Sequence, residues 1–523
     1  MNDYILSYMR ISKLYLILLL LLVVACGDRF GYSDLSTDAT HPLSELTIES
    51  GINSVYNIAK NEKIVINPVI SQSGKEKELS YTWEIDLKEV SYDATFTFEG
   101  EALGKYNCRF IVENEDGKTF FPFTVFVNSP YEEGITILSK DAKGNSMISF
   151  MQKPLEGEKG AFAAGDCFTV NNPDENFAAG AVDIVQCRDE SINSGWVIVA
   201  CNGGGENGDL PTIYYLNEKT FEVENKFTVA EFDVDKPLMF GIPPIVYPQT
   251  SYPVLCENGK VYDFSIGEAD VIQPRKLQST YDKSCIVNTA PTSYEILLWD
   301  KVNKGLALIY NGYGPYYCSK EYHLMLTDEK FKSLNRYNGR DLMMMTKIRM
   351  TDDQLNVTAR RNEFLIITQS VFQTISEVLY TDFWGYDFVE SAYTFEVANT
   401  HTQNSKLTGP VGVETPCIAN KTYNTLLFAD GNKVRVWNYA ALPNDLSKLM
   451  DAKTLYTIES EDAVITGFEI SDDHKKTYVA YYEPNSDKEL NGSLVVIDTD
   501  KGTLIEEFKN ISYQPVKMIY KKK

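Results

Sequence analysis

Residues 424–439 read NTLLFADGNKVRVWNY, a stretch that shows the unit from which most of the chain is built. An apolar strand is followed by an Asp-Gly-Asn turn and by a second strand in which apolar and polar residues alternate, which is the pattern of a β-hairpin. Similar units start near residues 135, 196, 252, 295, 364 and 477. The sequence therefore predicts a mostly β protein in which one strand–turn–strand motif recurs.

The spacing of the repeats favours a β-propeller over a single open sheet. Successive starts lie on average about 57 residues apart, and strand repeats of roughly 40 to 55 residues mark propeller blades, with insertions lengthening the step. An open sheet of so many strands would leave long unprotected edges, whereas a closed ring protects them. We therefore expect residues 131–523 to form a β-propeller of seven blades, with six and eight blades as the alternatives.

Two stretches interrupt the repeat. Residues 328–346 (DEKFKSLNRYNGRDLMMMT) and residues 443–453 (PNDLSKLMDAK) have helical composition and polar faces. They predict insertions between strands. Loops on a propeller face tolerate such insertions and commonly carry binding residues.

Residues 44–130 form the first predicted folded unit. Short alternating runs such as SYTWEI and KYNCRFIVEN are separated by turn clusters such as SQSGKEKE and EDGK. This pattern is typical of an antiparallel β-sandwich of the immunoglobulin type. The whole chain is therefore predicted to be all-β, with a sandwich followed by a propeller.

The first unit also resembles a known family. The run Tyr81-Thr82-Trp83-Glu84, followed by LGKYNCRF from residue 103 and a closing strand, resembles the PKD-like, immunoglobulin-type domain of Bacteroidetes lipoproteins. The resemblance implies that Trp83 is the core tryptophan and Tyr106 the tyrosine of a late strand. The next run, SPYEEGITILS at 129–139, is similar to the stretch that leads from this domain into a propeller-like C-terminal region in that family.

The N-terminus reads as a secretory signal. Arg10 and Lys13 precede an apolar run at 14–24, which at eleven residues is too short to span a bilayer comfortably. The run ends in Val-Val-Ala-Cys at Cys26, which resembles the lipobox of bacterial lipoproteins. The resemblance implies that residues 1–25 are removed and that Cys26 is acylated. The alternative is an ordinary signal peptide with an incidental cysteine.

Residues 26–43 are predicted to be a flexible tether, because they are polar and have no apolar period. The complete sequence has 49 Lys and Arg against 73 Asp and Glu, a formal charge of −24. Nucleic-acid binding is therefore not expected, since it requires a basic face. The same acidity disfavours adhesion to anionic lipid, which leaves the lipid anchor as the predicted membrane contact.

Local signatures of catalysis or metal binding are weak. The four histidines are far apart with no HExxH, and the cysteines form no CxxC, so we predict no metal site and no cofactor. Buried free thiols are favoured, although disulfides are permitted. The GGGENG run at 203–208 is interpreted as a hairpin loop rather than a dinucleotide site, because a strand follows it. The methionines at 343–345 and Met350 are interpreted as core packing or as part of an adaptable loop rather than as soft-metal ligands.

Aromatic residues in loop-like contexts are the candidate contacts for a ligand or partner. They lie in IYNGYGPYY (309–317) and LYTDFWGYDF (379–388), where Gly and Pro favour loops. Exposed aromatic rings supply large, rigid contact area. Packing of these rings into blade seams is the alternative. The candidates are Tyr313, Tyr316, Tyr317, Phe383, Trp384 and Tyr386.

The family resemblance supplies the expected function. Proteins of this type are accessory lipoproteins on the cell-surface side of the outer membrane, encoded beside SusC/SusD-type importers. The implied partners are a SusC-like TonB-dependent channel, a SusD-like lipoprotein and other surface lipoproteins, and the implied role is capture of oligopeptides without catalysis. The alternatives are a glycan-binding surface lipoprotein and a propeller glycoside hydrolase, although no local signature selects a carboxylate pair.

Overall fold

The computed structural model describes most of the chain after residue 42. The described residues are 43–154, 158–189, 194–228, 237–240, 251–257, 261–265, 272–274, 281–290, 293–302, 304–311, 320–323, 339–351, 353–354, 362–370, 376–383, 395–403, 410–440, 449 and 451–523. They divide into two compact units, one ending at Asn128 and one starting at Ser129. Both units are built almost entirely from β-strands.

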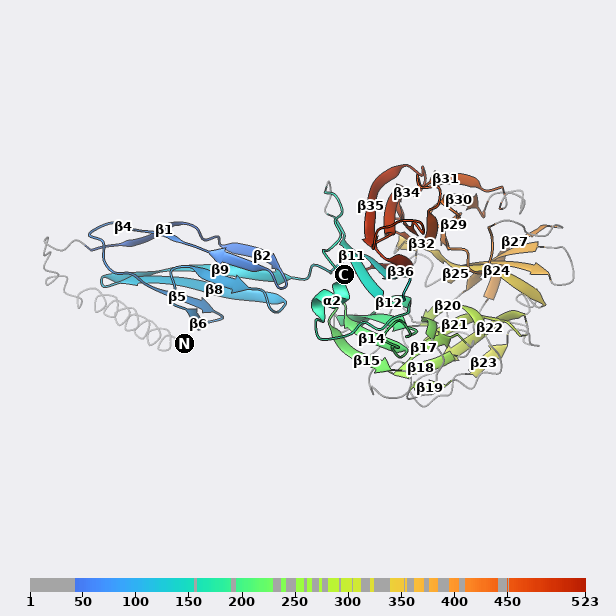
Figure 1. Ribbon diagram of the computed structural model, residues 1–523, viewed down its shortest axis with the longest axis horizontal. Helices are drawn as coiled ribbons and strands as arrows, with labels where there is room; N and C mark the ends of the chain where they lie inside the picture. The colour runs from blue at the N-terminus through green and yellow to red at the C-terminus, as the bar shows by residue number, and fades with distance from the viewer. Residues whose placement is uncertain are drawn as a thin grey trace, which may run out of the picture. The chain divides into compact units, whose positions relative to one another are not determined.

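The first unit contains nine strands in three sheets (Figure 1). A five-stranded sheet has the order β2-β9-β8-β5-β6, in which β2 runs parallel to β9 and the other pairs are antiparallel. The pairs β1-β4 and β3-β7 form the two smaller sheets. The strands are β1 (Leu46–Ser50), β2 (Val55–Ala59), β3 (Lys63–Ile66), β4 (Val69–Gln72), β5 (Ser80–Ile85), β6 (Lys88–Ser91), β7 (Phe96–Glu99), β8 (Gly104–Asn114) and β9 (Gly117–Asn128).

A single apolar cluster holds the first unit together. Trp83 on β5 is 1% exposed and lies at its centre, with its ring centroid 4.3 Å from that of Phe110 and 5.1 Å from that of Phe96. The alternation along β8 and β9 puts every second side chain into this cluster, as expected for strands with one buried face. The Trp83 indole N–H donates to the Asp93 carbonyl at 2.8 Å, so the buried ring has no unsatisfied donor.

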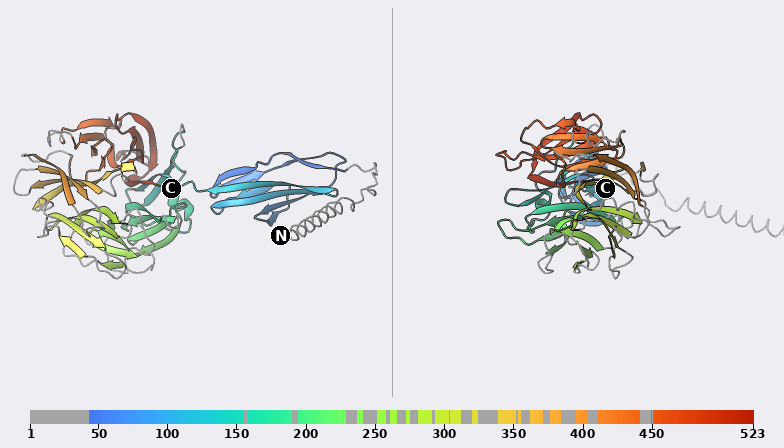
Figure 2. Two further views of the ribbon diagram at one scale, coloured as in Figure 1. Left: turned by 180° about the vertical axis from the view of Figure 1, so that it is seen from behind. Right: turned by 90° about the vertical axis from the view of Figure 1, so that its right-hand side faces the viewer.

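The second unit is a β-propeller. By hydrogen bonding its described strands form six sheets, one of which has eight strands and consists of two four-stranded sheets joined by a short parallel pairing, which gives seven sheets around the ring. Figure 1 shows these sheets fanned around a common centre, as does the view from behind in Figure 2. Five of them are antiparallel in simple chain order: β12 (Ala181–Asp189) to β15 (Val223–Thr228), β16 (Pro237–Phe240) to β19 (Ile272–Pro274), β20 (Tyr281–Ala290) to β23 (Lys320–His323), β24 (Arg340–Arg349) to β27 (Phe395–Gln403) and β32 (Val464–Ile470) to β35 (Leu504–Ser512). Their middle strands are β13 (Ser194–Cys201), β14 (Thr212–Asn217), β17 (Ser251–Cys256), β18 (Val261–Ser265), β21 (Ser293–Asp300), β22 (Gly305–Asn311), β25 (Asn362–Ser370), β26 (Ser376–Phe383), β33 (Lys476–Tyr482) and β34 (Gly492–Asp498).

The sixth sheet contains β28 (Cys417–Asn420), β29 (Thr425–Asp430), β30 (Lys433–Asn438) and β31 (Lys453–Thr457), and a short parallel pairing joins β28 to β24. The seventh sheet closes the ring. It pairs the C-terminal strand β36 (Gln514–Lys521) with β10 (Gly134–Lys140), which pairs in turn with β11 (Ser146–Gln152). β36 also contacts β12 and β32, the first strands of the sheets on either side. The two ends of the unit are thus joined in one sheet, which closes the ring.

Apolar clusters between neighbouring sheets hold the ring together. One cluster combines β10, β11 and helix α2 (Cys167–Asn171) with β12–β14, and another combines β29 and β30 with β32–β34. The outer side of β11 has no fourth strand among the described residues. α2 and a bridge between Met151 and Phe162 lie there instead, so this edge is covered.

Each of the seven predicted repeats lies in a different sheet. The expected helix at 328–346 is wrong for its final part, because residues 340–346 belong to β24. Met344 is 2% exposed and Met345 is 8% exposed, so these two methionines are core residues, which is one of the two predicted alternatives. The other expected helix, at 443–453, lies mainly outside the described residues, and its last residue begins β31.

Candidate functional site

The predicted contact residues lie almost entirely outside the described part of the structure. Phe383 is the last residue of β26, where its backbone pairs with Asn362 and Phe395. The other predicted residues, Cys26, Tyr313, Tyr316, Tyr317, Trp384 and Tyr386, all lie outside the described residues.

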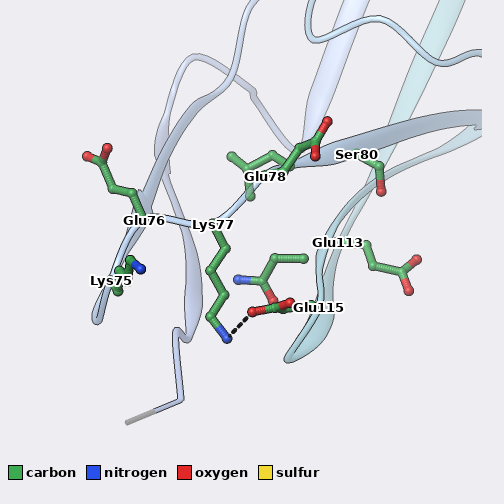
Figure 3. Close-up of a pocket in the computed structure, with 9 residues that line it drawn as sticks. Lys75, Glu76, Lys77, Glu78, Ser80, Glu113 and Glu115 are labelled. Carbon is green, nitrogen blue, oxygen red and sulfur yellow. Dashed lines mark ion pairs between the residues drawn. The ribbon is translucent and has the colours of Figure 1, made fainter. Parts of the chain in front are cut away.

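A polar groove of about 580 Å³ lies at one end of the first unit (Figure 3). The loop before β5 supplies Lys75 to Leu79, the end of β8 supplies Glu113 and Asn114, and the turn after β8 supplies Glu115. Figure 3 shows the Lys77 side chain reaching across the groove to Glu115, at an Nζ–Oε1 distance of 2.8 Å. Asp116 is a second ion-pair partner of Lys77. These hydrogen bonds, to Asp116 first and then to Glu115, raise the pKa of Lys77.

The turn between β8 and β9 also binds Ser44, near the residue where the first unit begins. The Ser44 N–H donates to the Asp116 carboxylate at 2.9 Å, and Asn114 Nδ2 donates to the Ser44 carbonyl at 2.9 Å. Lys77, Asp116 and Ser44 therefore form one hydrogen-bonded group. This group fixes the start of the folded chain and gives Lys77 and Asp116 structural partners.

A buried polar network links three sheets of the propeller. His474 lies in the turn after β32, is 3% exposed and has a φ of 60°. Its Nδ1 lies 2.8 Å from Thr422 Oγ1 and 2.9 Å from Asn420 Oδ1, both of which follow or end β28. Asn420 Oδ1 also accepts the Thr422 N–H at 2.8 Å, which identifies this atom as the oxygen and makes His474 Nδ1 the donor.

Charged residues adjoin this network. Arg349, the last residue of β24, pairs with the carboxylate of Glu469 on β32. Burial and the nearby Arg349 guanidinium lower the pKa of His474, against the opposing effects of the Met350 carbonyl and of Asp473. A neutral, enclosed imidazole hydrogen-bonded to side chains of a neighbouring sheet is a structural element.

The described cysteines are packing residues. Cys108, Cys167 and Cys201 are buried free thiols, as the sequence predicted, and burial raises the pKa of each to about 12. Such thiols are poor nucleophiles at neutral pH. In the described ranges, no group of three or more His, Cys, Asp or Glu side chains is arranged to hold a metal ion. A search of those ranges also found no helix with the length and apolarity needed to cross a bilayer.

The hairpin β5–β6 carries an exposed apolar group that sequence reasoning missed. Leu87 is 82% exposed, Val90 47% and Tyr92 66%. The Tyr92 hydroxyl donates to Glu89 Oε2 at 2.5 Å, and this bond raises the pKa of Tyr92. An Asp-Leu pair is not a usual signal for a tight hairpin turn, because that turn favours Asn-Gly or Asp-Gly. The only sequence signal was therefore one apolar residue, Val90, on a short, otherwise polar strand, with Leu87 just before the strand and Tyr92 just after it.

No protein-family model matches the chain, and no curated protein matches it. Similar solved structures include a quinonprotein alcohol dehydrogenase-like protein from Bacteroides thetaiotaomicron, at 12% identity over 91% of this chain and 99% of that one, with a TM-score of 0.44. The propeller domain of Myceliophteria thermophila Cps50 (Swd1) matches at 10% identity over 65% and 90%, with a TM-score of 0.36. Apo AztD from Citrobacter koseri matches at 10% identity over 74% and 97%, with a TM-score of 0.35. All three scores are below 0.5, so they carry no conclusion about activity, and the propeller assignment rests on the sheet order and on the ring in Figure 1.

Proposed function

We propose that the chain is an outer-membrane lipoprotein on the cell-surface side, acylated at Cys26, and an accessory subunit of a SusC/SusD-type TonB-dependent importer that helps to capture oligopeptides. The observation that carries the proposal is the apolar run at 14–24 that ends in Val-Val-Ala-Cys, directly ahead of a polar stretch and two folded β units. Two or three acyl chains on one cysteine give stable anchoring that a single chain does not.

The first unit is proposed to be the PKD-like, immunoglobulin-type domain that the sequence resembles. Two contacts support this assignment. Trp83 is enclosed at the centre of the apolar cluster, and the Tyr106 hydroxyl donates to the Ala102 carbonyl at 2.7 Å. A tyrosine near the start of a late strand that bonds to backbone a few residues upstream is the tyrosine corner of immunoglobulin domains.

A binding role rather than catalysis is proposed for the propeller. Several of its described charged groups are engaged in ion pairs, such as Arg349–Glu469 and Arg435–Asp430. A ring closed through β36 and β10 is a rigid support for loops on its faces, which is where binding residues commonly lie.

The test is isolation of the tagged, acylated protein from native outer membranes in mild detergent, followed by mass spectrometry. The expected result is copurification of a TonB-dependent channel and a SusD-like lipoprotein, with loss of both in Cys26→Ala. A wild-type protein that purifies alone would contradict the importer role. A panel of peptides and glycans then separates the ligand classes. Binding of peptides without turnover supports the proposal, and cleavage of a glycan would establish the hydrolase alternative instead.

A further inference from the structure

Exposed apolar side chains are concentrated in the first unit. Among the residues that the structure describes, eight of the fourteen exposed large apolar residues belong to this smaller unit. Three of the eight, Leu87, Val90 and Tyr92, fall within six residues on the hairpin β5–β6. Scattered apolar residues on a surface need no explanation, but a group of this kind on one element marks a contact surface.

The backbone of this hairpin is strained at its tip. Asp86 has a φ of 47° and Leu87 has a φ of 67°, both in the left-handed region that favours glycine. Leucine is unfavourable there, because its Cβ approaches the following carbonyl oxygen. At 82% exposure, Leu87 gains little from burial that would offset the strain. A two-residue turn between antiparallel strands requires a positive φ at both of its residues, so the turn explains the backbone. An exposed leucine in place of the favoured glycine gives the folded unit no benefit of its own.

The hairpin is rigidly held in spite of its exposure. Asp86 Oδ1 accepts the N–H of Asn107 at 3.2 Å and its Nδ2 at 3.1 Å, which ties the tip to β8. The buried Trp83 indole holds the Asp93 carbonyl just after β6. Glu89 holds the hydroxyl of the exposed Tyr92. Apolar anchors that are fixed before binding lose little entropy on association, which is the property of residues that dominate an interface.

The charge around these anchors defines the surface that they fit. Asp86, Glu89 and Asp93 adjoin these anchors in the chain, with Lys88 as the one cation on β6. A complementary partner therefore has an apolar pocket bordered by Lys or Arg. An anionic lipid surface does not fit, because these carboxylates and the net charge of −24 would be repelled.

The position of the hairpin in the chain restricts where the partner resides. About 17 residues separate Cys26 from the first unit, and they reach at most about 60 Å when fully extended. The first unit therefore stays close to the membrane if Cys26 is acylated. This step rests on the proposed function.

We propose that the hairpin β5–β6, through Leu87, Val90 and Tyr92, docks into an apolar pocket with a basic border on the outer-membrane channel of the proposed complex. The docking element is thus in the first unit, which leaves the loops of the propeller available for ligand. Leu87 and Tyr92 are the anchors, and Glu89 is a positioning residue that acts through Tyr92.

The test compares variants of the tagged, acylated full chain isolated from native outer membranes, with the TonB-dependent channel identified and quantified by mass spectrometry. Leu87→Asp is expected to lower the recovered channel at least tenfold. Val65→Asp is the matched control, because Val65 is 68% exposed on β3 in a different sheet, and it is expected to retain the channel. Leu87→Gly, which relieves the positive φ, is expected to lose the channel without a lower unfolding temperature.

Each other outcome overturns the proposal in a recognisable way. Equal recovery with Leu87→Asp and Val65→Asp would exclude the hairpin while leaving the importer role intact. Absence of the channel from the wild-type sample would overturn the importer role and the docking proposal together. Self-association in light scattering that Leu87→Asp abolishes would make a second copy the partner. Vesicle binding by the unacylated chain that Leu87→Asp abolishes would make lipid the partner.

Discussion

His474 makes the stability of the propeller dependent on pH. The ring is enclosed by Asn420 and Thr422 of the neighbouring sheet, with Arg349 nearby and Asp472 and Asp473 in its own turn. The pKa of His474 is lowered from its ordinary value of 6.5, so the unfolded chain takes up the proton more readily than the folded chain. The stability present above about pH 6.5 is therefore lost as the pH falls below that value.

The measurement is the unfolding temperature of the wild type and of His474→Asn from pH 8 to pH 5. Asparagine is neutral throughout this range and tolerates a positive φ. The wild type is expected to lose more stability than the variant between pH 7 and pH 5. Parallel curves would show that carboxylates alone account for the acid sensitivity.

Substitution of two glycines in the loop between β13 and β14 distinguishes the steric cost of a side chain from the cost of a positive φ. Gly203 has a φ of 72°, and a Cβ there would overlap the Asp209 carbonyl oxygen, whereas Gly208 has a φ of 65° with open space around it. Gly203→Ala is expected to lower the free energy of unfolding by about 2–3 kcal/mol and Gly208→Ala by about 1 kcal/mol. Denaturant unfolding of the two variants measures the difference. Equal losses would show that the loop relaxes around a side chain at residue 203.

The closing strand β36 is expected to determine whether the ring holds together. Met518 on this strand is 4% exposed and packs with β10 and the neighbouring sheet β32–β35, so its loss would uncover apolar surface on both sides. Deletion of residues 514–523 is expected to abolish cooperative unfolding of the propeller in calorimetry. Deletion of residues 522–523 is the control, because it leaves β36 intact and removes only the contacts beyond it, such as the Lys523–Glu132 ion pair, worth less than about 1 kcal/mol, and the hydrogen bonds between Gln186 and the Lys522 backbone. A longer deletion that unfolds like the control would refute closure through β36.

Strand–turn–strand elements were predictable because their signal is local. In NTLLFADGNKVRVWNY, the apolar run, the turn residues and the alternating run each act over a few residues, and together they predict β29 and β30. The Met-rich end of 328–346 was wrongly predicted to be helical, because methionine and leucine favour helices by themselves. This end forms a strand instead, because Met344 and Met345 pair with residues of β25. Tertiary context thus outweighed local propensity.

Contacts between sheets were not predictable, because nothing local encodes them. Asn420 and His474 are 54 residues apart and meet only because two blades lie side by side. The exposure of Leu87 is likewise a property of the folded hairpin, since the sequence predicts a strand there without saying which side chains lack a covering layer. The aromatic candidates such as Trp384 and Tyr386 remain predictions.

The charge of the whole molecule determines how the chain meets a membrane. With a formal charge of −24, its surface repels an anionic bilayer, and this repulsion acts over about 8 Å at physiological salt. A chain of residues 27–523, which lacks the acylated cysteine, is therefore expected to stay in the supernatant when sedimented with vesicles of neutral or anionic lipid, and lower salt is expected to strengthen its exclusion from the anionic ones. The acylated protein from native membranes is the control and is expected to sediment with both. Sedimentation of the unacylated chain with anionic vesicles would reveal a basic or apolar lipid-binding surface, and the acyl chains would then not be the sole membrane contact.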